Sequence, residues 1–280
     1  MRVIEIFERS PRGFLSHTLC YLSVNRMGNS AFNGMERPLY ILDPGQREEI
    51  PEKGVGFVVS KSAAKPGYFL SLGEDVLCRI FEGTPPFRLS VEQGGFVSVS
   101  RNADLLRPIP TGILTVSDKG SRGEREDLSG PALVRRLQPL GAVIEATATV
   151  PDEIEEIVET LKEWSDGRGL KLILSTGGTG FSRRDVTPEA FASIAEKTAP
   201  GIGETMRSAS MKITPKAMLS RSCAVIRGET LIVALPGSEK AAEECFAAIA
   251  PALRHGVEIL CGWDSECGSR PHQHHHKRNR

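Results

Sequence analysis

The 280-residue sequence lacks a net charge and a long apolar run. Its 35 basic and 35 acidic side chains cancel, which argues against a general nucleic-acid binder or a protein held on membrane surfaces by charge. No apolar run approaches the roughly 20 residues of a membrane span. Residues 1–13 have charges inside their apolar stretch and do not follow the plan of a signal peptide. We therefore expect a cytoplasmic protein that binds neither nucleic acid nor membrane.

Paired cysteines are also lacking. The six cysteines are scattered and form no CxxC motif, so they do not indicate a disulfide framework, and a reducing cytoplasm is their simplest compartment. Cys261 and Cys267 precede the histidines of a tail, residues 263–280, that is rich in histidine and arginine. We interpret this tail as flexible and solvated in preference to a metal site, because its spacing fits no structural zinc pattern. The residues are Cys20, Cys78, Cys223, Cys245, Cys261 and Cys267, with His272, His274, His275 and His276.

The length predicts two domains at about 150 residues each. Two prolines and a glycine close together in residues 105–112 predict a linker, and we place the boundary near residue 109. Residues 1–109 contain short apolar or alternating runs between glycine and proline turns, which predicts a small β-rich barrel or sandwich. The first domain carries no chemical motif, and its one histidine, His17, is of a kind that is more often structural than catalytic. Its function stays open.

Residues 110–262 alternate between apolar runs and helical patterns. Residues 113–117, 143–150 and 170–176 predict strands, and residues 223–226 and 230–235 predict an antiparallel hairpin near the sheet edge. This order predicts an α/β fold, in which a mostly parallel open sheet has helices on both faces.

The helices of this part carry their own signals. We expect Ser129 to cap the first, which ends at Gly141, and Thr187 to cap a later one that opens with Pro188. The final helix follows residue 236 and is expected to bend or break at Pro251. The expected buried faces comprise Leu133, Val134, Leu137 and Leu140 in the first helix and Ile154, Ile157, Val158, Leu161 and Trp164 in the second.

Polar and glycine-rich segments follow the predicted strands, where ligands bind in open α/β sheets. A glycine-rich turn, Thr176 to Gly180, lets main-chain amides approach a phosphate. Asp152 and Asp185 offer oxygen ligands to Mg²⁺, which takes one or two carboxylates together with substrate phosphates. Such a site suits phosphoryl or nucleotidyl transfer. The other segments contain Ser117, Asp118, Asp127 and Ser129, then Pro236, Gly237, Ser238 and Lys240, with further charge from Arg183 and Arg184.

Plainer interpretations stay open at this point. The glycine turn is also what a tight strand-to-helix connection needs, and the sequence has neither GxxxxGK[ST] nor GxGxxG. Asp152 also suits a helix start, and Ser117-Asp118 an ordinary turn. Asp185 has no evident local duty if Thr187 is the cap, although Arg184 could pair with it at the surface.

Eight motifs in order extend these observations across the second half of the chain. Residues 110–262 resemble the molybdenum-cofactor biosynthesis adenylyltransferases, namely the bacterial molybdopterin adenylyltransferase and the G domain of its plant and animal counterparts. The motifs are Val116-Ser117-Asp118, Asp127-Leu128-Ser129-Gly130, Pro151-Asp152-Glu153, Thr176-Gly177-Gly178-Thr179-Gly180, Arg184-Asp185-Val186-Thr187-Pro188-Glu189-Ala190, Pro200-Gly201-Ile202-Gly203-Glu204 with Arg207, Leu219-Ser220-Arg221 and Leu235-Pro236-Gly237.

The resemblance implies a reaction in which molybdopterin and Mg-ATP give adenylyl-molybdopterin and pyrophosphate. It implies that Asp152 and Asp185 are the catalytic, Mg²⁺-handling pair, that the protein is a homotrimer, and that the molybdate-insertion protein is a partner. The substrate- and nucleotide-binding residues that it implies are Ser117, Asp118, Thr176, Gly177, Gly178, Thr179, Gly180, Arg184, Glu204, Ser220, Pro236, Gly237, Ser238 and Lys240.

One position departs from the family pattern. The family commonly has Pro-Gly-x-Pro-Lys after the last strand, whereas here Glu239 replaces the second proline and adds negative charge near an anionic pocket. The alternative function is a non-catalytic molybdopterin-binding or carrier module whose activity is set by the first domain. A third hypothesis makes the first domain itself a sulfur-carrier or cofactor-handling domain.

Overall fold

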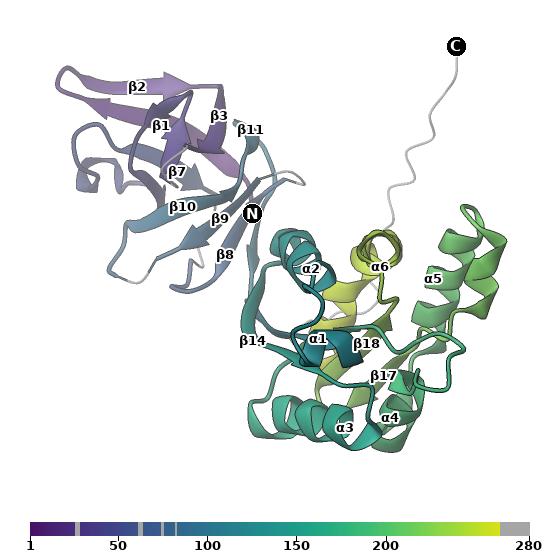
Figure 1. Ribbon diagram of the computed structural model, residues 1–280. Coiled ribbons are helices and arrows are strands. Elements are labelled where there is room, and N and C mark those ends of the chain that lie inside the picture. Colours follow the sequence, from purple (N-terminus) through teal and green to yellow (C-terminus); the bar gives the residue numbers. More distant parts are fainter. Residues whose placement is uncertain (26–28, 61–63, 74–75, 82, 264–280) are drawn as a thin grey trace, which may run out of the picture. The chain divides into compact units, whose positions relative to one another are not determined.

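The computed structural model describes residues 1–25, 29–60, 64–73, 76–81 and 83–263. The chain forms two compact units, each described separately below (Figure 1). The first contains residues 1–109 and 134–143, and the second contains residues 110–133 and the chain from residue 144 onward. Within the segment predicted as a flexible tail, only Trp263 belongs to the described residues; Cys267 and the four tail histidines lie outside them.

The first unit consists of strands, as the turn-rich sequence predicts. An eight-stranded sheet has the order β12-β8-β9-β10-β6-β7-β1-β2, and a four-stranded sheet has the order β11-β3-β4-β5. The strands are β1 (Val3–Ser10), β2 (Gly13–His17), β3 (Leu19–Val24), β4 (Ser30–Phe32), β5 (Met35–Glu36), β6 (Leu39–Leu42), β7 (Val55–Val59), β8 (Phe69–Leu72), β9 (Val76–Ile80), β10 (Phe87–Gln93), β11 (Gly95–Ser98) and β12 (Ala103–Leu106), with a 3-10 turn, η1 (Arg47–Glu49), before β7.

The period of the apolar residues explains how these strands pack. All five residues of β7 are buried, whereas β3 alternates, with Cys20 and Leu22 inside and Leu19 and Tyr21 exposed. Successive side chains of a strand point to opposite faces, so this alternation turns one face of β3 to the core. Cys20 and Cys78 lie in that core as free thiols, and burial raises the pKa of each to about 12.

The second unit contains a six-stranded sheet of order β14-β13-β15-β18-β17-β16. β13 pairs with β15 and β15 with β18 in parallel, whereas β17 forms an antiparallel hairpin with β18, which confirms the predicted hairpin. Every residue of β15 and β18 is buried, as expected for strands covered on both faces. The bounds are β13 (Ile109–Val116), β14 (Ala142–Val150), β15 (Leu172–Thr176), β16 (Lys197–Thr198), β17 (Ala224–Arg227) and β18 (Thr230–Leu235).

Helices cover both faces of this sheet. α3 and α4 lie on one face, and α5 and α6 lie on the other (Figure 1). Ile157 and Leu161 of α3 and Phe191 of α4 share one buried cluster with strand residues. The helices are α1 (Asp118–Ser121), α2 (Ser129–Leu137), α3 (Ile154–Lys162), α4 (Thr187–Ile194), α5 (Pro200–Met211) and α6 (Glu239–Leu260), with short turns η2 (Gln138–Leu140), η3 (Glu163–Gly167) and η4 (Pro215–Leu219).

Several local predictions about the helices are wrong. Ser129 is the first residue of α2 and not its cap, because the Asp127 carboxylate accepts the N–H groups of Ser129 and Gly130, each at 3.0 Å. Val134 and Ile154 are exposed, although Leu133 and Leu137 in the first helix and Ile157, Leu161 and Trp164 in the second are buried as predicted. α6 continues through Pro251 as one helix of 22 residues, so the helix does not break there, and a bend at Pro251 stays a prediction.

The linker signal also has a different structural basis. Of residues 105–112, only Arg107 and Pro108 lie outside strands, since β12 ends at Leu106 and β13 begins at Ile109. Proline is tolerated at a strand boundary because the ladder does not need its missing N–H there. The two prolines therefore mark the junction of two strands.

Candidate functional site

The ends of four strands bring the predicted loops together at one edge of the second unit's sheet. The N–H of Ser117, directly after β13, donates to Val150 O at the end of β14, at 2.8 Å. The N–H of Gly177, directly after β15, donates to Leu235 O at the end of β18, at 3.2 Å. Segments from residues 117, 150, 177 and 235 are thus joined by main-chain hydrogen bonds at the carboxyl edge, where ligands bind in such sheets.

Asp118 and Asp152 hold each other at this edge. The N–H of Asp118 donates to Oδ2 of Asp152 at 2.9 Å, and the N–H of Asp152 donates to Oδ1 of Asp118 at 3.2 Å. Ser117 caps the short helix α1 that begins with Asp118, because its Oγ accepts the N–H of Gly120. The two aspartates are therefore fixed by main-chain contacts between loops that are 34 residues apart.

Arg184 closes the same cluster. Its Nε and Nη2 donate to the two carboxylate oxygens of Asp118, at 3.0 and 2.8 Å, and its Nη1 donates to Glu153 at 2.8 Å. This fork, chiefly through its hydrogen bonds, lowers the pKa of Asp118 below its ordinary value. The surface pair with Asp185 that the sequence offered as a plain interpretation of Arg184 is not what forms.

Asp152 has the opposite electrostatic environment. Its side chain is buried, and burial is the main cause that raises its pKa above the ordinary value. The N–H of Asp118 opposes this shift, whereas the neighbouring carboxylates of Asp118 and Asp185 add to it. A buried carboxylate close to two others is a place where a cationic group relieves unfavourable charge.

The glycine turn after β15 is required by close packing. Gly177 has φ +98° and lies against Val116 O, and Gly178 has φ +61° and lies against the Thr187 hydroxyl, so neither position has room for a side chain. The Thr187 Oγ1 donates to Gly177 O at 2.9 Å. Thr187 therefore anchors the turn and makes no cap hydrogen bond at the start of α4, which corrects its predicted role.

The Asp185 side chain has a structural role in its own loop that the sequence did not indicate. Its Oδ2 accepts the N–H of Ser182 at 2.7 Å, which fixes the side chain inside its own loop. The loop is held from outside by Arg221, whose Nε donates to Gly180 O at 2.8 Å and whose Nη2 donates to Asp185 O at 2.5 Å. Arg221 also pairs with Glu189 of α4.

Arg221 belongs to one of the eight sequence motifs, but the sequence indicates no role for it. The signal was an arginine in an otherwise small and polar loop, but its target is main chain 36 to 41 residues away, which no local pattern specifies.

A cavity of about 160 Å³ lies at this edge, between the loop after β13, the end of β15 and the turn after β18. Thr176 lines it, and the Thr176 hydroxyl is buried with no hydrogen-bond partner in the described part of the protein. A buried hydroxyl without a partner is costly, so a polar ligand atom is its expected complement. The lining residues are Thr115, Val116, Ser117, Gly120, Arg125, Glu126, Asp127, Leu128, Ser129, Thr176, Gly237, Ser238 and Glu239.

Several expected site residues lie apart from this cavity. Lys240 is strongly exposed and is 3.9 Å from Glu244 of the same helix. Glu204 is exposed on α5, and Ser220 donates to the Ser222 hydroxyl at 3.0 Å. None of the three lines the cavity, whereas Ser117, Thr176, Gly237 and Ser238 do.

The carboxylates at this edge could hold a metal whose remaining ligands come from a substrate. Within the described ranges, no three His, Cys, Asp or Glu side chains gather into a metal site. Asp152 and Asp185 are near enough for their charges to interact, and Mg²⁺ is commonly held by one or two carboxylates and completed by substrate phosphates. The donor set therefore fits a metal that arrives with a nucleotide. Among the described residues, no helix is long and apolar enough to cross a membrane.

Comparisons with known proteins match this half of the chain. The family model described as "Probable molybdopterin binding domain" matches residues 112–255. The molybdopterin adenylyltransferase of Helicobacter pylori is 40% identical over 56% of this chain and 90% of its own length. Gephyrin of Dictyostelium discoideum is 43% identical over 53% of this chain, but the match spans only 22% of gephyrin.

Solved structures agree on the fold. The molybdopterin biosynthesis enzyme MoaB of Thermus thermophilus has a TM-score of 0.53 and 45% identity, over 55% of this chain and 97% of its own. The tungsten cofactor synthesizing protein MoaB of Pyrococcus furiosus has a TM-score of 0.51 and 33% identity, over 55% of this chain and 98% of its own. These likenesses confirm the predicted α/β fold of the second half.

Proposed function

The chain belongs to the family of probable molybdopterin binding domains, and from that premise we propose that its second unit adenylylates molybdopterin with ATP. Its place is in molybdenum cofactor biosynthesis, and its class is nucleotidyltransferase, as in the relatives named molybdopterin adenylyltransferase. The substrates are molybdopterin and ATP, and the products are adenylyl-molybdopterin and pyrophosphate. Assembly as a homotrimer and contact with a molybdate-insertion protein are part of the same proposal.

One arrangement carries this proposal. Buried Asp152, held by the N–H of Asp118, lies next to the glycine turn: a side chain on Gly178 would come within 3.1 Å of its Oδ1. A carboxylate next to a turn that binds phosphate is unfavourable by itself, because like charges repel. Asp152 beside this turn is favourable where a cation and a polyphosphate bind together, since the cation is attracted to the carboxylate and to the phosphates.

The proposed reaction transfers an adenylyl group. An oxygen of the terminal phosphate of molybdopterin attacks the α-phosphorus of ATP and forms the new P–O bond. The bond from the α-phosphorus to the α–β bridging oxygen breaks, and its electron pair leaves with pyrophosphate. The residues of this chain orient the two phosphates. The turn Thr176 to Gly180 offers its main chain, and the Thr176 hydroxyl, which has no partner among the described residues, offers a donor.

The role proposed for Asp152 and Asp185 is to hold Mg²⁺ that enters with the nucleotide. Bound there, Mg²⁺ would neutralise phosphate charge, which is the main electrostatic need of phosphoryl-group chemistry. Arg184 keeps Asp118 ionised and in place, so that Asp118 supports Asp152 through its main chain.

The test is pyrophosphate release by the full chain with molybdopterin, ATP and Mg²⁺. Asp185→Asn is expected to bind molybdopterin and to turn over at least about a hundredfold more slowly. Asp104→Asn, an exposed residue of β12 in the first unit, is the matched control and should keep full activity. Molybdopterin binding without pyrophosphate release in the unmodified protein would instead establish the carrier function, and unchanged turnover in Asp185→Asn would remove Asp185 from the mechanism.

A further inference from the structure

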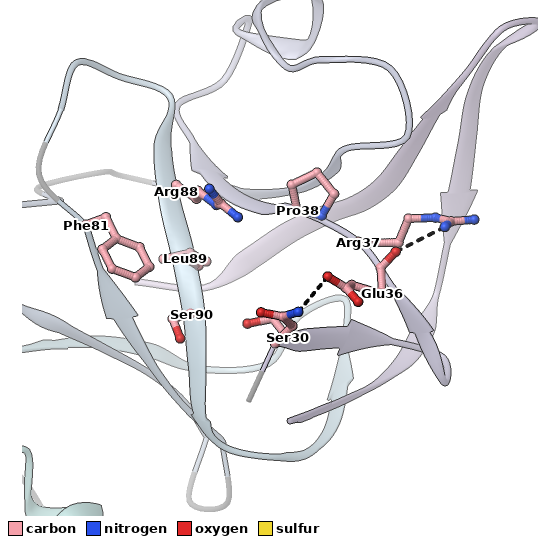
Figure 2. Close-up of a pocket in the computed structure, with 9 residues that line it drawn as sticks. Ser30, Glu36, Arg37, Pro38, Phe81, Arg88, Leu89 and Ser90 are labelled. Atoms are coloured by element: carbon pink, nitrogen blue, oxygen red, sulfur yellow. Dashed lines mark hydrogen bonds between the residues drawn. The ribbon is translucent and has the colours of Figure 1, made fainter. Parts of the chain in front are cut away.

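The strand-rich first unit has a cavity of its own, of about 550 Å³ (Figure 2). This volume lies within the range of about 300–1,000 Å³ that is usual for small-molecule sites. Residues of β10, together with Phe81 just after β9, form one side, and the segment of β5 that leads into β6 forms the other. The lining residues are Asn29, Ser30, Glu36, Arg37, Pro38, Phe81, Arg88, Leu89 and Ser90.

Two of the three charged side chains that line this cavity, Arg37 and Glu36, make hydrogen bonds within the protein. Arg37 donates through Nε to Glu8 at 2.9 Å, so its charge is balanced within the protein. The Glu36 carboxylate accepts from Asn29 at 2.8 Å and from Asn25 at 3.2 Å (Figure 2 shows the Glu36 side chain directed between the two sides). These contacts orient Glu36, and within the described ranges its carboxylate has no ion-pair partner.

Arg88 is the third charged side chain that lines the cavity. Its guanidinium makes no ion pair and no side-chain hydrogen bond among the described residues, although it borders the cavity and points toward Pro38 (Figure 2). Phe81 stays 46% exposed at the same side, whereas Leu89 between them is buried. An exposed phenylalanine beside an unpaired arginine gives a surface on which a planar ring can stack and an anion can bind.

We propose that this cavity binds a nucleoside monophosphate. The phosphate pairs with Arg88, whose fork matches phosphate oxygens bidentately. A ring N–H or exocyclic amino group of the base donates to Glu36, and the face of the base packs on Phe81 and Pro38. The phosphate and an N–H donor of the base complement Arg88 and Glu36, which make no ion pair among the described residues, in a cavity of this size. The inference does not depend on the function proposed for the second unit.

Hydrogen exchange of the full chain with millimolar AMP, GMP or CMP tests the proposal. Residues 29–38 and 81–90 are expected to gain protection with at least one of the three nucleotides. The nucleotide that protects them at the lowest concentration identifies the preferred base. Nucleotide bound at the second unit protects residues 117–118 and 176–180 instead, so failure at one site is distinguishable from failure at the other.

Matched variants sharpen the test. Arg88→Gln and Glu36→Gln should each weaken the protection of residues 29–38 and 81–90 by about tenfold to a hundredfold in the half-saturating concentration. Arg12→Gln makes the same charge change in the β1–β2 turn, away from the cavity, and should have no effect. No protection at either segment by any of the three nucleotides, or equal protection by adenosine and by inorganic phosphate alone, would overturn the assignment. Circular dichroism confirms that the variants fold, and Arg88→Lys, which keeps the charge, should recover part of the binding.

Discussion

The N–H groups of Asp118 and Asp152 each donate to the other residue's carboxylate, at 2.9 and 3.2 Å. This exchange links the loop after β13 to the loop after β14 without any side chain pairing with another. It also gives the two carboxylates different chemistry. Arg184 lowers the pKa of Asp118, whereas burial raises the pKa of Asp152. Groups whose surroundings drive their pKa values apart are typical of functional sites.

Asp152→Asn should separate activity from stability. The pKa of Asp152 is raised in the folded protein, so as pH rises above the ordinary value of 3.8 the unfolded chain loses this proton first. The folded state then loses relative stability until its own pKa is passed. Asparagine keeps the shape and carries no charge, so the variant should unfold at the same or a higher temperature at neutral pH. Adenylylation should fall by at least about a hundredfold.

Asp166→Asn is the control with the opposite sign. Arg227, through its hydrogen bonds, lowers the pKa of Asp166. Its stabilising effect is therefore present above pH 3.8 and is lost as pH falls through the lowered pKa. Asp166→Asn should lower the Tm at neutral pH and leave turnover unchanged. A lower Tm for Asp152→Asn at neutral pH, measured by calorimetry at several pH values, would contradict the conclusion that the Asp152 charge destabilises the folded protein.

Arg221→Met should loosen the loop that carries Asp185. The lost hydrogen bonds to Gly180 O and Asp185 O involve a charged donor, so about 2 kcal/mol of stability is at stake. Turnover should fall by about tenfold to a hundredfold because Asp185 is misplaced. Hydrogen exchange of residues 180–185 should rise in the variant. Arg122→Met removes an exposed arginine paired with Glu124 and should change neither the stability, nor the turnover, nor the hydrogen exchange of residues 180–185.

Gly177→Ala tests whether the glycine turn is set by packing. A Cβ at this position would strike Val116 O, and φ is +98°, so the variant should lose about 2–4 kcal/mol of unfolding free energy. Gly201→Ala is the matched control, since a Cβ there meets nothing within 4 Å and φ is ordinary. It lies in α5 and should gain about 0.4–1 kcal/mol. Equal denaturant midpoints for the two variants would show that Gly177 has room.

The sequence predicted the sheets more accurately than the contacts between loops. Period and apolar runs located β13, β15 and the β17–β18 hairpin, because burial of a strand depends on its own residues. The short strands β4 and β5, of three and two residues, carried too little pattern to be seen.

The side-chain partners could not be predicted in the same way. Ser129 and Thr187 matched cap signals, yet their hydroxyls donate to Gly237 O and Gly177 O. The partner of Arg184 is Asp118, 66 residues away, and not its neighbour Asp185. Such choices are made by which loops meet at the sheet edge, and local spacing contains no information on that.

Glu239→Gln tests the position that departs from the family pattern. Glu239 borders the cavity next to Ser238 and begins α6, so its carboxylate adds negative charge where phosphate is proposed to bind. Acidic residues are favourable at a helix N-terminus by about 0.3–1 kcal/mol, so the variant should be slightly less stable.

The same variant should bind ATP several-fold more tightly, and the gain should shrink as salt is added, because screening weakens charge repulsion. Calorimetric titration of the full chain with Mg-ATP at low and high ionic strength measures both effects. Glu145→Gln, an exposed residue of β14 that does not line the cavity, is the charge-matched control and should leave ATP affinity unchanged. Weaker ATP binding by Glu239→Gln would mean that Glu239 contributes a favourable contact to the nucleotide, and the repulsion argued here would be wrong.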